Sequence, residues 1–199
     1  LANMVAALDI ISDGRLELGI GAGWNEEESR AYGIELGTVK ERLDRFEEAT
    51  QVLIGLLSQP TTTFDGKFYQ LDSARNEPKG PQRPHPPICM GGSGEKRTLR
   101  IAARYADHWN FVQGTPEEFA HKRDVLRAHC TDIGRDPSEI TVSAHIWVNP
   151  EHDYQKLLAE VAAFGSAGMD LAIIYLPPPL DPSVLEPLAS AIADSGLAR

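Results

Sequence analysis

The sequence predicts an α/β fold in which a parallel sheet is covered by helices. Five apolar, strand-like runs alternate with amphipathic helical segments, and two of the strands end in glycine clusters. No low-complexity segment or linker divides the 199 residues. A repeated strand-then-helix order is what parallel strands with helical crossovers require. Two architectures fit this order, an open doubly wound sheet and part of a (β/α)8 barrel, and the pattern alone does not choose between them.

The first unit opens with a helix over residues 1–12, closed by Ser12-Asp13-Gly14 with Gly14 as the expected C-cap. A strand over residues 15–20 follows and runs into the first glycine cluster. The next helix, over residues 39–57, repeats its apolar side chains with a period of 3.6 residues. Glu26, Glu27 and Glu28 lie between this strand and this helix, where acidic side chains suit a helix N-terminus.

Residues 61–87 are predicted to be an insertion in the alternation of strands and helices. Asp65-Gly66 separates two β-prone runs within residues 61–71, which predicts a hairpin. The Pro-rich connector of residues 78–87 then leads to the next strand. Long loops after barrel strands usually shape substrate sites, so we expect this of the insertion.

The remaining units are regular. Leu99, Ala102, Ala103 and Ala106 recur at i, i+3, i+4 and i+7, which predicts a helix buried on one face. The later strands are expected at residues 87–90, 107–112, 140–148 and 170–176. The later helices are expected at residues 95–106, 116–133, 153–164 and 182–194.

Composition excludes several classes of protein. The net charge is −10, with 19 basic and 29 acidic residues, and no basic cluster stands out. This argues against binding to nucleic acid or to anionic membranes. No apolar run reaches the roughly 18 residues of a membrane span, and no signal peptide is evident. Cys89 and Cys130 lie in apolar elements, which favours buried free thiols in a cytoplasmic protein over a disulfide.

The second glycine cluster, Gly91-Gly92-Ser93-Gly94, is the strongest indication of a ligand site. Glycines between a strand and a helix let the backbone approach a ligand, and the free N–H groups and helix dipole there favour phosphate. We expect the N–H groups of Gly92 and Gly94 to point into the pocket. A plain strand-to-helix turn is the alternative. The spacing is not that of a phosphate-binding P-loop.

The first cluster, Gly19-Ile20-Gly21-Ala22-Gly23, also has competing interpretations. It lacks the third glycine of the dinucleotide-binding pattern. An S-adenosylmethionine-dependent methyltransferase is an alternative, although the long gap before the next helix argues against it.

Three segments carry a resemblance to luciferase-like flavin and deazaflavin oxidoreductases. They are residues 1–24, residues 82–107 and the run Gly134-Arg135-Asp136-Pro137. Together they resemble that family over essentially the whole chain, and most closely its branch that uses coenzyme F420. The resemblance implies a (β/α)8 barrel, of which residues 1–199 would form the C-terminal part, strands four to eight, with three strands and two helices missing.

The resemblance also implies a function. We expect an enzyme that transfers a hydride between F420 and an organic small molecule, in a complete protein that is a homo-oligomer. The alternative within the same superfamily is a monooxygenase that uses FMN as its cofactor in place of F420. A barrel remnant that only binds a ligand, or is inactive, is the non-enzymatic alternative.

Site residues follow from the same resemblance. The cofactor-binding residues it implies are Gly23, Trp24, Met90, Gly91, Gly92, Ser93, Gly94 and Asn110. Trp24 would wall the pocket, with core packing as its alternative role, and Asn110 would point inward to the cofactor. No catalytic residue is assigned, and His108 is not expected to be one. The other histidines show no metal-ligand spacing, so no metal is expected.

Overall fold

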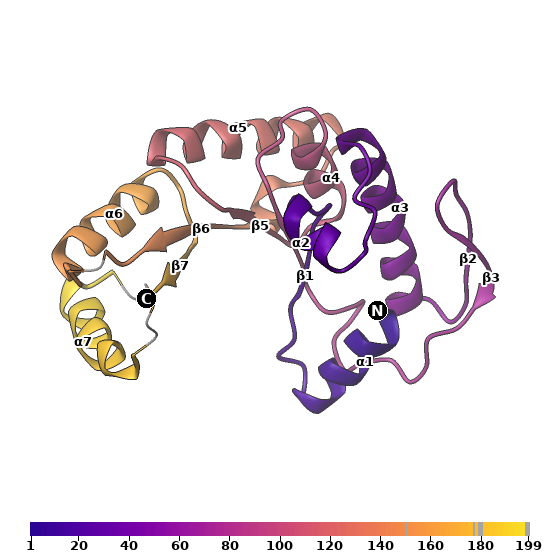
Figure 1. Ribbon diagram of the computed structural model, residues 1–199, viewed down its shortest axis with the longest axis horizontal. Helices are drawn as coiled ribbons and strands as arrows, with labels where there is room; N and C mark the ends of the chain where they lie inside the picture. Colours follow the sequence, from indigo (N-terminus) through magenta and orange to yellow (C-terminus); the bar gives the residue numbers. More distant parts are fainter. Residues whose placement is uncertain (150, 177, 179–180, 198–199) are drawn as a thin grey trace.

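The computed structural model describes residues 1–149, 151–176, 178 and 181–197. Five parallel strands form one sheet in the order β1, β4, β5, β6, β7 (Figure 1). Their bounds are β1 Leu18–Ile20, β4 Ile88–Gly91, β5 His108–Phe111, β6 Thr141–Trp147 and β7 Leu171–Tyr175. The order follows the sequence, whereas a doubly wound sheet would place β1 between later strands. The barrel-type arrangement is therefore confirmed.

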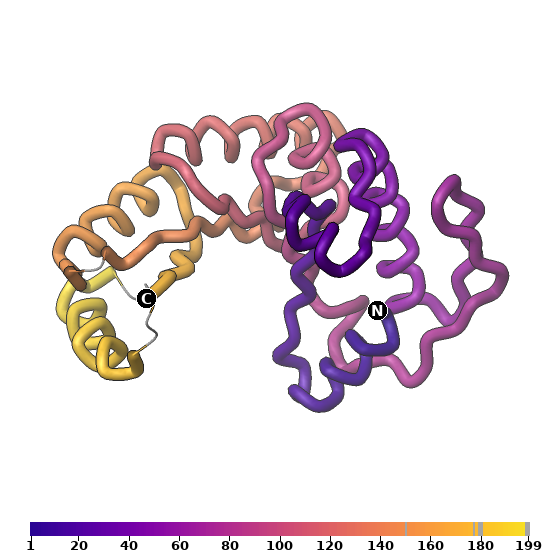
Figure 2. The backbone as a smooth tube through the Cα atoms, viewed as in Figure 1, coloured from indigo at the N-terminus to yellow at the C-terminus, as the bar shows by residue number. Residues whose placement is uncertain are grey.

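The sheet bends into an arch, and helices follow its outer side (Figures 1 and 2). The helices are α1 Ala2–Ile11, α2 Glu26–Ala31, α3 Val39–Ser58, α4 Thr98–Tyr105, α5 Pro116–Asp132, α6 Tyr154–Ser166 and α7 Leu185–Ser195. Thr38 and Thr115 each begin a helix with a capping box, in which side chain and backbone satisfy each other's donors. No helix in the described part of the chain is long and apolar enough to cross a membrane.

Helix α1 ends differently from the expectation. Its C-cap is Ser12, and Asp13 rather than Gly14 takes the first left-handed position, with φ of 53°. The N–H of Asp13 donates to Ile10 O at 3.1 Å and that of Gly14 to Asp9 O at 3.0 Å. This is a Schellman motif, in which an aspartate tolerates the left-handed conformation.

Helix α4 begins at Thr98, three residues later than expected. The intervening residues 95–97 form a turn, and the N–H of Leu99 donates to Gly94 O at 3.0 Å. The glycine cluster is therefore followed by a tight turn before the helix, so its N–H groups do not belong to the first helical turn.

The expected hairpin exists, with a longer loop. Strands β2 (Thr62–Asp65) and β3 (Gln70–Ala74) pair antiparallel beside α3, away from the main sheet (Figure 1). The loop spans residues 66–69 because Glu48 of α3 binds its backbone. The Glu48 carboxylate accepts N–H groups from three loop residues, Lys67, Phe68 and Tyr69, at 2.7–3.2 Å. Desolvation opposes ionisation of Glu48, but these donors outweigh it and lower its pKa.

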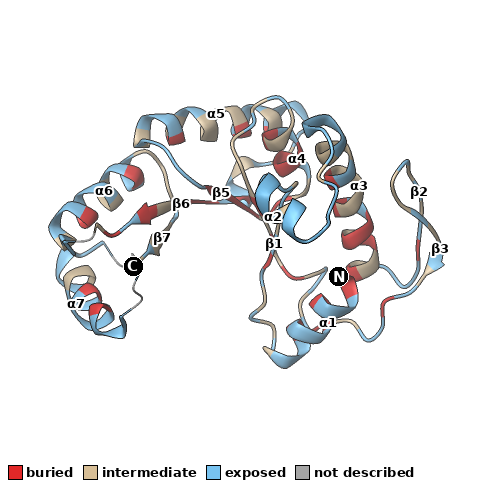
Figure 3. Cartoon of the chain, in the orientation of Figure 1, coloured by how far each residue is buried: buried red, intermediate tan, exposed pale blue. Residues whose placement is uncertain are grey.

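The core lies between the sheet and the outer helices, where the buried residues gather in Figure 3. Its centre is an aromatic cluster. Trp109 of β5 stacks on Phe119 of α5 with centroids 5.7 Å apart, and Phe111 meets Phe119 edge-on at 5.6 Å. Phe164 of α6 packs against Phe119 at 5.7 Å. Such contacts add to the free energy of area burial and fix the helices on the strand.

Asp9 ties α1 to the Pro-rich connector. Its side chain is fully buried and accepts bonds from Gln82 N at 3.1 Å and Gln82 Nε2 at 2.7 Å. Gly80 is necessary there, because a Cβ would overlap the Asp9 carboxylate.

Asp9→Asn is expected to lower the free energy of unfolding by about 1–3 kcal/mol, because an amide cannot accept both bonds from Gln82 without turning a donor towards one of them. Urea denaturation measures the change. Asp13→Asn is the matched control: Asp13 is exposed and asparagine also tolerates its conformation, so the effect should stay within about 0.5 kcal/mol. Equal stability of the two variants would contradict the structural role of Asp9.

Candidate functional site

Both glycine clusters lie at the carboxyl edge of the sheet. Strand β1 pairs with β4 in the register Ile20↔Met90, so Gly21 and Gly91 follow at the same level of neighbouring strands. In parallel α/β folds ligands bind at this edge. The structure therefore brings together two segments that are 70 residues apart in the chain.

Glycines form a flat patch on the inner face of the arch. Side chains alternate along a strand, and Leu18, Ile88 and Met90 point into the helix-covered core. Gly19, Gly21 and Gly91 therefore face inward. A Cβ on Gly19 or Gly21 would meet no described atom within 4 Å, and one on Gly91 only Val112 Cγ2 at 3.8 Å. We call these three residues the glycine floor; it offers a flat, open surface to a planar ring.

The loop after β4 supplies donors, but not all of those expected. The N–H of Gly92 donates weakly to Asn110 O at 3.4 Å, extending the sheet, so the expectation that it points into the pocket is wrong. The carbonyl of Gly92 accepts the Trp109 indole N–H at 2.8 Å. Within the described chain, the N–H groups of Ser93 and Gly94 have no hydrogen-bond partner. These two donors remain available to an anion.

A groove of about 500 Å³ lies beside this loop, between Ser93 and the start of α5. Its lining includes Lys122, whose ammonium contacts Glu95 at 2.5 Å, His121, which lies 2.9 Å from the same carboxylate, and two further acidic residues, Glu117 and Glu118. Hydrogen bonds from Lys122 and His121 lower the pKa of Glu95, so it stays ionised and pairs with the Lys122 ammonium. The anion-binding capacity here therefore rests on backbone N–H groups rather than on free cations.

Three other expected site residues occupy different environments. Asn110 faces inward and is 6% exposed, in line with the expected direction. Trp24 is 82% exposed, which excludes core packing as its role in the described chain. Met90 is fully buried in the helix-facing core, so its side chain points away from the inner face. Met90 is among the expected cofactor-binding residues, but its side chain does not reach a ligand on the inner face. Strand alternation turns Met90 away from that face because its neighbour Gly91 faces inward.

A second hollow, of about 420 Å³, opens between the loop after β1 and α3. Gly21 and Gly23 line one side, and Arg42, Arg45 and Tyr69 line the other. Tyr69 brings the hairpin loop to this hollow. The hairpin loop, which Glu48 holds in place, thus lines the same hollow as Gly21 of the glycine floor.

A hydrogen-bonded chain of polar side chains crosses the inner face. His108 Nδ1 lies 2.7 Å from Glu17 Oε1, and its Nε2 lies 2.6 Å from Ser143 Oγ. Asn110 Nδ2 donates to the same Ser143 oxygen at 2.7 Å. A carboxylate only accepts, so Nδ1 donates to Glu17; Nε2 then accepts the Ser143 hydroxyl proton. The chain fixes both the imidazole and the Asn110 amide.

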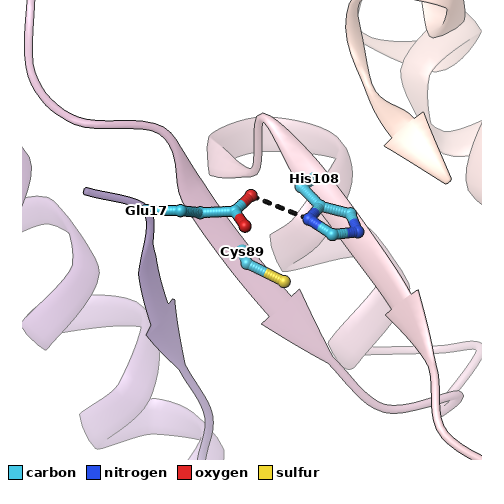
Figure 4. A group of neighbouring side chains, drawn as sticks. All are labelled: Glu17, Cys89 and His108. Carbon is cyan, nitrogen blue, oxygen red and sulfur yellow. Dashed lines mark hydrogen bonds and ion pairs between the residues drawn. The ribbon is translucent and has the colours of Figure 1, made fainter. Parts of the chain in front are cut away.

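Cys89 lies beside this chain, on the strand between Glu17 and His108 (Figure 4). Burial, with a smaller contribution from the Glu17 charge, raises its pKa to about 11. Both cysteines are free thiols, as expected, but the surroundings of Cys89 are polar rather than apolar. Sequence reasoning missed this group because its members lie far apart in the chain, on β4, on β5 and just before β1. One signal was available in the sequence. Glu17, Cys89 and His108 are each next to a core-facing residue of a strand, so strand alternation places all three on the opposite, inner face.

The described fold matches known proteins. The family model of luciferase-like monooxygenases matches residues 1–192. An F420-dependent secondary alcohol dehydrogenase superposes with a TM-score of 0.85 at 20% identity, over 98% of this chain and 74% of that one. The F420-dependent tetrahydromethanopterin reductase of Methanopyrus kandleri gives 0.79 at 15% identity, over 98% and 77% of the two chains. These likenesses establish the barrel-type fold.

Curated relatives are similar in sequence. The FMNH2-dependent dimethylsulfone monooxygenase of Pseudomonas putida is 32% identical over 81% of this chain and 44% of its own length. The pyrimidine monooxygenase RutA of Agrobacterium fabrum is 30% identical over 76% of this chain and 45% of its own. The protein is thus of the parallel, barrel-type α/β class. The chain belongs to the luciferase-like monooxygenase family, and it spans less than half the length of these two relatives.

Gly92→Ala is expected to destabilise the fold by about 1–3 kcal/mol, because its φ is +111° and a Cβ would lie 3.2 Å from Thr98 Cγ2. Thermal unfolding measures this. Gly91→Ala is the control, since its Cβ meets only an ordinary contact and its φ is not positive. Equal melting temperatures for the two variants would show that the loop backbone is not constrained.

The raised pKa of Cys89 predicts slow alkylation. A shift from 9.0 to about 11 leaves about 100-fold less thiolate at neutral pH than in an unperturbed thiol. Iodoacetamide labelling, followed per cysteine by mass spectrometry, should accelerate at Cys89 as pH rises towards 11. If Cys89 is labelled at neutral pH as fast in the folded protein as in urea-unfolded protein, the raised pKa of Cys89 is contradicted. Cys130 is fully buried and should remain slow throughout.

Proposed function

We propose that this chain provides part of the cofactor site of an F420-dependent oxidoreductase that transfers a hydride to or from an organic small molecule. The observation that carries the proposal is the glycine floor beside the free N–H groups of Ser93 and Gly94. A flat, side-chain-free patch suits a planar ring, and adjacent backbone donors suit the phosphate attached to it. Both features lie at the carboxyl edge of one parallel sheet.

In this proposal each residue has a defined task. The N–H groups of Ser93 and Gly94, with the Ser93 hydroxyl, bind the phosphate. Gly91 and Gly21 let the ring approach the strands, and the Asn110 amide, held by Ser143, lies next to Gly91 in the register Gly91↔Asn110. The deazaflavin, when bound, supplies the hydride chemistry. The protein orients the ring and limits water on its inner side.

The loop after β1 contributes Gly23 and Trp24 to the proposed cofactor site. Gly23 has φ of +79° and lines the hollow next to α3, while Trp24 is exposed beside it. A large exposed aromatic next to a glycine in the left-handed conformation can cover a ring that lies on the glycine floor. We assign it that role, and we assign no catalytic acid or base within the described residues.

An FMN-dependent monooxygenase is the second candidate. The specific observation in its favour is the sequence similarity of 30–32% to relatives described as FMNH2-dependent dimethylsulfone monooxygenase and pyrimidine monooxygenase. FMN also presents a planar ring and a phosphate, so the same floor and loop suit it. The two candidates differ in the ring chemistry and in the tail beyond the phosphate.

Titration of F420 and of FMN against intrinsic tryptophan fluorescence distinguishes the candidates. We expect F420 to bind at least about tenfold more tightly than FMN, a difference of about 1.4 kcal/mol. Tight FMN binding with no response to F420 would replace the proposal by the second candidate. Saturable binding of neither would reject a cofactor site in the chain as it stands.

Gly91→Ala should weaken binding of the preferred cofactor by roughly 10- to 100-fold, because an extra methyl group in a close contact costs about 1–3 kcal/mol. The melting temperature should change little, since the added Cβ meets no close neighbour. Gly165→Ala, in α6 with open space around its Cβ, is the matched control and should leave binding unchanged. Unaltered affinity in Gly91→Ala would remove the glycine floor from the site.

A further inference from the structure

Three side chains of different chemistry converge on the inner face, next to Gly19 of the glycine floor. A carboxylate oxygen of Glu17, the sulfur of Cys89 and a ring nitrogen of His108 all lie within 4.8 Å of one another. Figure 4 shows the Glu17 carboxylate directed at the imidazole, with Cys89 on the strand between them. Oxygen, sulfur and nitrogen donors this close define a coordination space rather than a simple ion pair.

The sheet itself sets this convergence. Cys89 and His108 are register partners on β4 and β5, and Glu17 immediately precedes β1, the other neighbour of β4. All three side chains point to the same face by strand alternation. Their backbones are fixed by sheet hydrogen bonds, so a ligand that binds all three needs little rearrangement.

The imidazole is already oriented for coordination. His108 is 5% exposed, and its Nε2 contacts Ser143 Oγ, which is itself fully buried. Nδ1 is thereby turned towards Glu17 and Cys89. Histidine ligands of metals usually have their second nitrogen hydrogen-bonded in this way, because the partner fixes the ring and its tautomer. Ser143 can accept from Nε2–H as well as from Asn110 Nδ2, since a hydroxyl oxygen has two lone pairs.

The donor set selects the kind of ion. Thiolate and imidazole with one carboxylate suit Zn²⁺ and similar borderline transition ions, whereas Ca²⁺ and Mg²⁺ prefer oxygen ligands alone. Three protein ligands leave a fourth tetrahedral position for water or another group. The Glu17 side chain is 45% exposed, so an ion can reach the group from the open face.

We propose that Glu17, Cys89 and His108 form a binding site for a zinc-type divalent cation. The site borders the glycine floor at Gly19, the register partner of Cys89 on the neighbouring strand, and lies about 7 Å along β4 from Gly91, since Cys89 precedes Gly91 by two residues of strand. None of its three ligands is among the residues assigned to the cofactor above, so the proposal does not depend on which cofactor binds there.

Binding has a defined proton balance. Without metal, the thiol of Cys89 keeps its proton, and the Nδ1 proton of His108 is shared with Glu17. With metal, Cys89 coordinates as thiolate and its proton goes to solvent. The imidazole remains neutral but coordinates through Nδ1, so its proton sits on Nε2 and is donated to Ser143. One proton is released for each ion bound, and affinity therefore rises with pH.

Titration of the metal-free chain with Co²⁺ tests the proposal directly. We expect a thiolate-to-cobalt charge-transfer band in the near ultraviolet, saturating at one equivalent, and displacement of Co²⁺ by Zn²⁺. A pH indicator in weakly buffered solution should register the released proton. Absence of the band at mildly alkaline pH would overturn the proposal and leave Glu17 and His108 as a hydrogen-bonded pair.

Variants locate the site. Cys89→Ser should abolish the band, while Cys130→Ser, which alters the other cysteine far from these ligands, should retain it. Glu17→Gln changes an exposed side chain and should weaken Co²⁺ binding without unfolding the protein; circular dichroism checks the fold. Ser143→Ala should keep the band but weaken binding roughly 10- to 100-fold, as for a partner of a histidine ligand. A band that survives Cys89→Ser, or is lost in Cys130→Ser, would place the ion elsewhere.

Discussion

The structure depends on the burial of both faces of strand β5. Trp109 and Phe111 point outward into the aromatic core, whereas His108 and Asn110 point inward to the polar chain, and all four residues are buried. Strand alternation makes these two sets inseparable, because a shift of one residue would put the indole on the inner face and the imidazole in the core. The outer packing of α5 and α6 therefore also fixes the inner-face register.

The same strand controls the loop at the carboxyl edge. The Trp109 indole N–H donates to the carbonyl of Gly92, and the carbonyl of Asn110 accepts from the N–H of Gly92. Gly92 is thus held by one side chain and by the backbone of β5, with a positive φ that favours glycine. Ser93 and Gly94 follow with unused N–H groups. The loop geometry that makes a phosphate site plausible comes from a buried tryptophan as much as from the glycines themselves.

The inner face is not chemically uniform. Near β1, β4 and β5 it carries the glycine floor and the polar chain. Near β6 and β7 it carries exposed aromatics: Trp147 and Tyr175 have ring centroids 4.5 Å apart, and His145 contacts the same tyrosine at 4.6 Å. Desolvation lowers the pKa of His145, so this end favours a neutral imidazole. A ligand lying across the arch would meet donors at one end and apolar rings at the other.

Local patterns determined much of the protein. Apolar periodicity predicted the five strand–helix units, and the glycine clusters marked the edge where ligands bind, because period and turn chemistry act between near neighbours in the chain. They could not predict that Met90 turns into the core, that Glu48 reshapes the hairpin loop, or that Gly92 donates into the sheet. They also could not join Glu17, Cys89 and His108. Each of these depends on which strands become neighbours and in which register, and only the packing of Trp109 and its partners across the sheet decides that.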